Sequence, residues 1–226
     1  MKTMKSLVLA LALAAGATTA NAEVITINLD REFSGGTAPS GPAPWLTATF
    51  TDIGANTVRL DMSRAATLAN GEFISVWLFN LNPALSPSIL SFNQTSGPTA
   101  AASVRTGGDT QSGFRGDGGS YFDFKFEWPT QGNSADRFDQ DWTTASVTIS
   151  GSGISAASFM DLGFGAGNSP NGLYTAAHVQ GTGGGGQSGW ITGNPVLVPL
   201  PPAAWAGLAG LGLAGVATHL RRRKHA

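Results

Sequence analysis

The chain has 226 residues, with 13 basic and 14 acidic side chains and no cysteine. Between residues 23 and 197, seven basic residues stand against all 14 acidic ones, so this segment carries a net charge of −7. Such an acidic segment argues against nucleic acid and anionic polymers as partners. The absence of cysteine excludes a disulfide framework, thiol catalysis and cysteine-bound metals.

Residues 1–22 have the layout of a secretory signal peptide. Two lysines precede an apolar stretch over residues 6–15, and small residues at 20–22 provide a cleavage site. The apolar stretch is too short to span a bilayer. We therefore expect signal peptidase to cut between Ala22 and Glu23, so that Glu23 becomes the first residue of an exported protein.

Residues 23–193 alternate between apolar and polar side chains with the period of a β-strand, and a helical period is almost absent. Clusters of Gly, Ser, Pro and Asn separate the apolar segments and favour turns. The expected strands are residues 24–29, 45–52, 57–62, 73–81, 88–92, 121–128, 145–150, 158–162, 174–180 and 189–192. Residues 63–70 could form a helical turn. The pattern predicts an all-β domain, an antiparallel β-sandwich of jelly-roll type, with a barrel as the alternative.

Two of these strands have a distinctive pattern. Residues 73–81 are apolar on both faces, which indicates a central strand. Residues 121–128 alternate most regularly, and we expect them to form one half-buried strand. Its buried face would carry Phe122, Phe124, Phe126 and Trp128, and its solvated face Tyr121, Asp123, Lys125 and Glu127.

We find no set of residues that indicates catalysis. His178 is the single histidine between residues 23 and 197, and no Gly-x-Ser-x-Gly elbow accompanies it. Asp123 and Glu127 would lie about 13 Å apart on one strand, wider than a glycosidase pair. The expectation is therefore a protein that is not an enzyme.

Two kinds of binding residue remain. Asp136, Asp139 and Asp141 form an oxygen-rich loop that could hold calcium, although aspartates that only end strands are the alternative. No other cofactor is indicated. Trp142 and Trp190 lie next to loops and could stack against sugar rings, although packing in the core or at its rim is the alternative.

The last part of the chain has three pieces in order. Residues 194–201 are expected to form a linker with a proline motif, Val198, Pro199, Leu200 and Pro201. Residues 202–220 form an apolar span of about 28 Å as a helix, enough for one membrane crossing. Residues 221–226 form a basic tail in which Arg221, Arg222, Arg223 and Lys224 would stop transfer and stay cytoplasmic.

This tail resembles the PEP-CTERM sorting signal that exosortases read, with Pro199-Leu200-Pro201 in the place of Pro-Glu-Pro. Segments of the body, among them Val76-Trp-Leu-Phe-Asn80 and Ala177-His-Val-Gln180, are similar to a group of secreted PEP-CTERM proteins. The resemblance implies exosortase as a partner and a membrane-anchored protein that then resides at the cell surface or in the extracellular matrix. It assigns no catalytic residue.

Two functions follow as expectations. The first is a non-enzymatic structural or adhesive role at the surface or in the matrix. The second is a carbohydrate-binding module, with or without the assistance of calcium, that acts on exopolysaccharide, because exosortase systems are associated with exopolysaccharide production.

Overall fold

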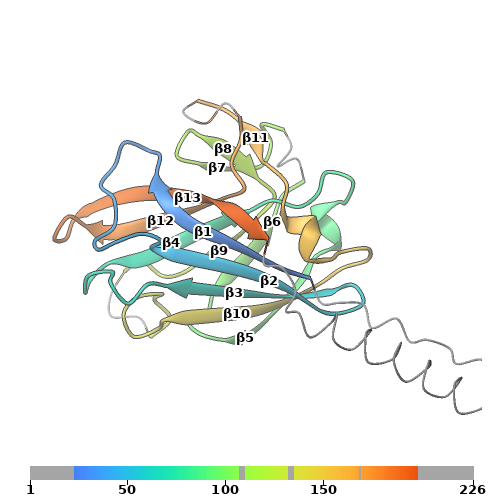
Figure 1. Ribbon diagram of the computed structural model, residues 1–226, viewed down its shortest axis with the longest axis horizontal. Helices are drawn as coiled ribbons and strands as arrows, with labels where there is room; N and C mark the ends of the chain where they lie inside the picture. Colours follow the sequence, from blue (N-terminus) through green and yellow to red (C-terminus); the bar gives the residue numbers. More distant parts are fainter. Residues whose placement is uncertain (1–22, 107–109, 132–134, 168, 170, 198–226) are drawn as a thin grey trace, which may run out of the picture.

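The computed structural model describes residues 23–197 except residues 107–109, 132–134, 168 and 170. Ten strands form one large sheet and three short strands form a smaller one (Figure 1). All the strand pairings are antiparallel. In the described residues, helix is confined to two 3-10 segments, η1 (Pro87–Ile89) and η2 (Ala156–Phe159). The prediction of an all-β antiparallel domain is confirmed.

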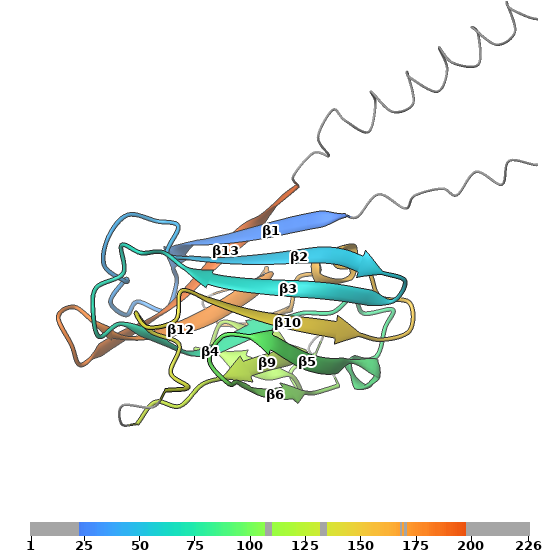
Figure 2. The same cartoon turned by 90° about the horizontal axis from the view of Figure 1, so that it is seen from below.

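The large sheet curls round until it is nearly closed into a barrel (Figure 2). Phe92 on one edge strand contacts Phe124 and Phe126 near the other edge, with ring centroids 5.6 and 5.4 Å apart. We expected two sheets packed as a jelly roll. The structure has one continuous sheet, which is closer to the barrel alternative. Its strands in spatial order are β5 (Ser91–Ser96), β10 (Thr144–Ser150), β3 (Thr57–Arg64), β2 (Leu46–Gly54), β1 (Val24–Glu32), β13 (Gln187–Leu197), β12 (Thr175–Thr182), β4 (Phe73–Phe79), β9 (Phe124–Glu127) and β6 (Ala101–Val104).

The alternating residues of the strands form the core inside this curled sheet, as the period of two predicts. Every second side chain of β1, β2 and β3 is buried, and the rings of Phe50, Phe79 and Phe159 stack or meet edge to face at its centre. The fully or almost fully buried aliphatic side chains on these three strands are Ile25, Ile27, Leu29, Leu46, Val58, Leu60 and Met62.

The smaller sheet covers part of the outer face of the large one. It consists of β11 (Phe164–Gly165), β8 (Ser120–Phe122) and β7 (Phe114–Gly116). Strand β4 is therefore buried on both sides: Trp77 and Phe79 point into the main core, and Leu78 joins Phe122 in a second apolar cluster. This explains why the sequence of β4 is apolar on both faces, as expected for a central strand.

The expected strand over residues 121–128 is two strands in two different sheets. The break falls at Asp123, which is buried rather than solvated. Its carboxylate accepts a hydrogen bond from the N–H of Leu81 (2.9 Å), and its own N–H donates to the carbonyl oxygen of Phe79 (3.0 Å). These bonds turn the chain from one sheet into the other, so that Phe122 packs in the second cluster whereas Phe124 and Phe126 pack in the main core.

Other expectations also differ from the structure. The strand expected over residues 88–92 is only partly present, because η1 ends at Ile89 and β5 begins at Ser91. Of the strand expected over residues 158–162, Ser158 and Phe159 belong instead to η2, which begins with a capping box between Ser155 and Ser158, and residues 160–162 form no regular structure. Residues 65–70 form turns and no helix. Residues 194–197, expected to begin the linker, are the last part of β13, because they pair with residues 25–28 of β1.

The pairing of β1 with β13 brings the two ends of the described chain together. Ile25 lies opposite Leu197, so the strands enter and leave the domain at the same end (Figure 2). The signal-cleavage residue Ala22, the Val198 to Pro201 motif, the apolar span 202–220 and the basic tail 221–226 lie outside the described residues. Within those that are described, no helix is long and apolar enough to cross a membrane.

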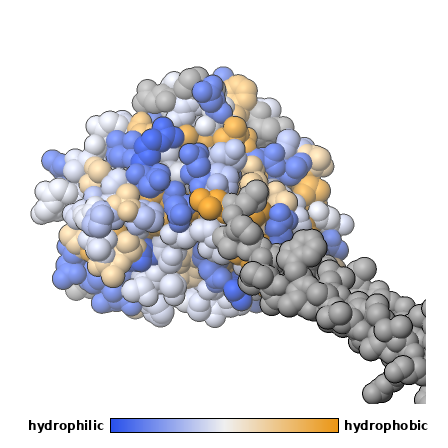
Figure 3. Space-filling view, in the orientation of Figure 1, coloured by the Kyte–Doolittle hydropathy of each residue, from blue (hydrophilic) through white to orange (hydrophobic). Residues whose placement is uncertain are grey.

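On the face shown in Figure 3, hydrophobic side chains lie in small patches among hydrophilic ones. The described large hydrophobic residues with substantial exposure are Ile53, Val104, Trp142, Leu162, Phe164 and Val196. Scattered exposed apolar residues are normal for a protein surface.

The burial of Phe124 gives a stability prediction. Phe124 is 0% exposed and contacts Phe79 and Phe159, at 5.4 and 5.7 Å between ring centroids. Phe124→Ala should lower the free energy of unfolding by roughly 3–5 kcal/mol, measured by urea denaturation, because it leaves a cavity in the core. Phe164→Ala, at a ring 38% exposed, is the matched control and should cost much less. Equal losses for the two variants would show that β9 is misplaced.

Candidate functional site

The end of the domain opposite the termini gathers several loops. Strands β1 and β3 end there at Glu32 and Arg64, and β10 begins there at Thr144, opposite Ser63. The segment 135–143, which enters β10, lies at this far end.

Phe138 fixes this segment to the sheet. Its side chain is fully buried and packs on Trp128, with ring centroids 5.0 Å apart. Its carbonyl oxygen accepts a hydrogen bond from the N–H of Ile74 (2.9 Å), which makes an isolated β-bridge to β4. A buried anchor of this kind holds the residues that follow it in one conformation.

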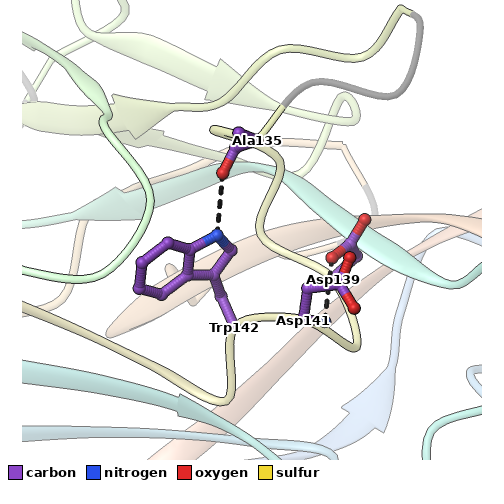
Figure 4. Close-up of a pocket in the computed structure, with 4 residues that line it drawn as sticks. All are labelled: Ala135, Asp139, Asp141 and Trp142. Atoms are coloured by element: carbon purple, nitrogen blue, oxygen red, sulfur yellow. Dashed lines mark hydrogen bonds between the residues drawn. The ribbon is translucent and has the colours of Figure 1, made fainter.

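Trp142 stands at the surface with its ring held in place. The indole Nε1–H donates to the carbonyl oxygen of Ala135 (2.7 Å), and the backbone N–H donates to that of Asp139 (3.1 Å). The side chain is nevertheless 38% exposed. Figure 4 shows it beside Asp139 and Asp141, and the four residues line a pocket of about 230 Å³.

The two carboxylates of this pocket differ in their partners. One oxygen of Asp139 accepts the N–H of Asp141 (3.1 Å), while Asp141 itself is exposed. Arg64, which is almost completely buried, lies close enough to Asp139 to feel its charge. Burial lowers the pKa of the Arg64 guanidinium, and the negative charges of Asp139 and then Glu72 oppose that shift.

The structure does not gather the three aspartates suggested for calcium. Asp136 accepts a hydrogen bond from the N–H of Thr99 (3.2 Å), whereas Asp139 and Asp141 line the Trp142 pocket. Among the residues that the structure describes, no three His, Cys, Asp or Glu side chains form a group that could hold a metal ion.

Trp190, the second tryptophan suggested for sugar stacking, is only half-exposed. It lies opposite His178 on the outer face of the large sheet, and the two rings stack with centroids 4.8 Å apart. It also packs against the second apolar cluster. One face of the indole is therefore occupied, because the neighbouring strand places a histidine against it.

His178 also touches a serine. The Oγ of Ser75 lies 3.0 Å from Nδ1 of His178 and 3.3 Å from its carbonyl oxygen. Ser75 is the extra residue of a β-bulge in β4 and is 6% exposed. The Ser75 hydroxyl hydrogen-bonds to groups beside the bulge. Because it is so buried, it is poorly placed to attack a substrate. Burial lowers the pKa of His178, and the negative charge of Asp117 partly opposes this.

A cleft between the two sheets was not foreseen from the sequence. It is lined by residues from four separated strands and one loop, among them Arg105, Phe114, Lys125 and Trp190. These residues share no motif or spacing, so no local signal indicates them. The sequence predicted only that the side chain of Lys125 points outward from its strand.

Comparisons of the chain with protein-family models, with curated proteins and with solved structures gave no match.

The lowered pKa of His178 predicts a pH dependence of stability. Because the folded pKa lies below the usual value of 6.5, the unfolded chain binds a proton more readily. The contribution of His178 is fully present above pH 6.5 and is lost as the pH falls through the folded pKa. We expect urea denaturation at successive pH values to show a loss of stability below pH 6.5 that is smaller in His178→Gln. If the difference in the free energy of unfolding between the two proteins does not change with pH, the pKa of His178 is not lowered in the folded protein.

Proposed function

We propose that this chain is an exported, non-enzymatic protein of the cell surface or extracellular matrix. Its signal peptide over residues 1–22 would direct export, and its tail would first anchor it in the membrane and then deliver it to exosortase. The observation that carries the proposal is the order of proline motif, apolar span and basic stop in residues 198–224.

Each part of the tail has a physical role. Pro199, Pro201 and the proline that follows lack an N–H and disfavour helix, so we expect the motif to be extended outside the span. The 19-residue span would hold the motif at the outer surface of the membrane. The basic residues 221–224 would resist transfer through it.

The fold is compatible with attachment through this tail. Because β13 ends beside the start of β1, a membrane anchor after residue 197 would hold the domain by one end. The Trp142 pocket lies at the other end, roughly 25–30 Å away along strands of seven to nine residues. The domain would thus present its far loops outward.

The burial of the serine that contacts His178 supports a non-enzymatic role. The serine next to it is buried and belongs to a β-bulge. Asp123, one of the two carboxylates considered for glycosidase chemistry, is buried and bound to backbone.

A second candidate function is carbohydrate binding, favoured by the Trp142 pocket. A pinned indole presents a flat apolar face at little cost in conformational entropy, which suits the C–H face of a sugar ring. Asp139 and Asp141 provide oxygens that accept hydrogen bonds from sugar hydroxyls. The proposed ligand is a neutral segment of exopolysaccharide.

Export and sorting are tested on protein from its native host by intact-mass measurement. We expect a mature chain that begins at Glu23 and ends at or near residues 199–201. In a strain without exosortase, the protein should keep its tail and stay in the membrane fraction. A chain that keeps Met1 would refute export, and one that keeps Ala226 despite an active exosortase would refute sorting.

The carbohydrate proposal is tested by calorimetric titration of the protein with neutral cello-, xylo- and manno-oligosaccharides. Trp142→Ala should weaken binding about tenfold or more, because the stacking surface is lost. Trp190→Ala is the matched control and should bind as the unaltered protein does. Repeating the titration with calcium and with a chelator shows whether an ion assists. Unchanged binding by Trp142→Ala, or no binding of any of these sugars, would contradict the proposal.

A further inference from the structure

A cleft of about 250 Å³ opens between the small sheet and the outer face of the large sheet. Val76 of β4 and Glu127 of β9 lie opposite each other on its floor, and Leu78 and Lys125 form the next pair. Phe114 of β7 supplies one wall. Trp190 closes the cleft at one side, in the same row as Val76.

Positive charge is concentrated in this cleft although the segment as a whole is acidic. The guanidinium carbon of Arg105 and the ammonium of Lys125 each lie 4.7 Å from the centre of the Phe114 ring. Lys125 pairs with Glu127 (2.6 Å), whereas Arg105 makes no ion pair with a described residue. Arg115 also lines the cleft, with its guanidinium over Tyr121.

The net charge of the cleft is therefore positive, with three basic residues and one carboxylate. The cations of Arg105 and Lys125 both lie over the Phe114 ring, so they are at most twice 4.7 Å apart and repel each other. An anion between them would relieve that repulsion. The acidic residues elsewhere weaken this local attraction little, because charges beyond about 8 Å are largely screened at physiological salt.

We propose that the cleft binds a carboxylate-bearing sugar ring, such as a uronic acid unit. The carboxylate accepts hydrogen bonds from Arg105, whose planar guanidinium matches it, and interacts with Lys125. The apolar face of the ring lies against Val76 and the accessible part of Trp190. This site is separate from the Trp142 pocket and does not depend on it.

The size of the cleft limits the ligand. Its volume is below the roughly 300–1,000 Å³ of pockets for drug-sized molecules. About one ring is thus enclosed, and the neighbouring units of an oligosaccharide extend into solvent. A long anionic polymer is disfavoured by the net charge of −7, so short chains are the expected ligands.

The test is calorimetric titration of the full chain in detergent with trigalacturonate at low salt. The fully methyl-esterified trisaccharide, which has the same shape without the charge, should not bind. Arg105→Gln, an exposed residue whose change leaves the core intact, should weaken binding about tenfold or more. Arg59→Gln is the matched control on a different strand and should bind normally. Raising the salt should weaken binding by the unaltered protein.

One further variant separates the two sites, and a competition experiment separates the ligands. Trp142→Ala should bind trigalacturonate normally, even if it loses neutral sugars. Acetate and inorganic phosphate should compete only weakly. Equal binding of the acid and its ester, unchanged binding by Arg105→Gln, full competition by phosphate, or no binding of trigalacturonate to the folded protein would each overturn the proposal.

Discussion

The pairing of the first and last described strands holds the rest of the structure in place. Strand β1 lies between β2 and β13, so it joins a group of four strands on one side to a group of five on the other. The contact is very close at Gly193, where a Cβ would lie 1.6 Å from the carbonyl oxygen of Asn28. Only glycine fits there. Without this pairing, the sheet would separate into two parts and its core would be exposed.

The pairing of β1 with β13 also determines which end of the domain would face away from a membrane anchor. The proposed anchor after β13 and the proposed leader before β1 would both join the domain at the same end. The loops at the other end include the Trp142 pocket, and the basic cleft lies on the outer face between the sheets. The proposed neutral and acidic sugar sites are thus distinct in position and in charge, and both lie on the surface.

Much of the fold could be predicted because strand periodicity is a local property. The buried faces of β1, β2 and β3 follow from alternation, and the doubly buried β4 follows from a segment that is apolar on both faces. The single curled sheet depends on which strands pair, and the break at Asp123 depends on partners 42 residues away, such as Leu81. Because strand pairing is not local, the sequence could not show that Trp190 is half-buried in a stack on His178. The exposure of Trp142 beside its loop, in contrast, was one of the predicted alternatives.

The pairing of β1 with β13 can be tested directly because the chain has no cysteine of its own. Thr26 and Val196 lie opposite each other, and opposed residues of antiparallel strands have Cα atoms about 4.5–5.5 Å apart, within the range of a disulfide. Thr26→Cys with Val196→Cys should form an intramolecular disulfide on mild oxidation, measured by mass and by non-reducing electrophoresis. Thr26→Cys with Asn194→Cys, two residues out of register, should form it much less readily. The pairing of β1 with β13 would be contradicted if the second pair formed the disulfide more readily than the first, or if neither pair formed it.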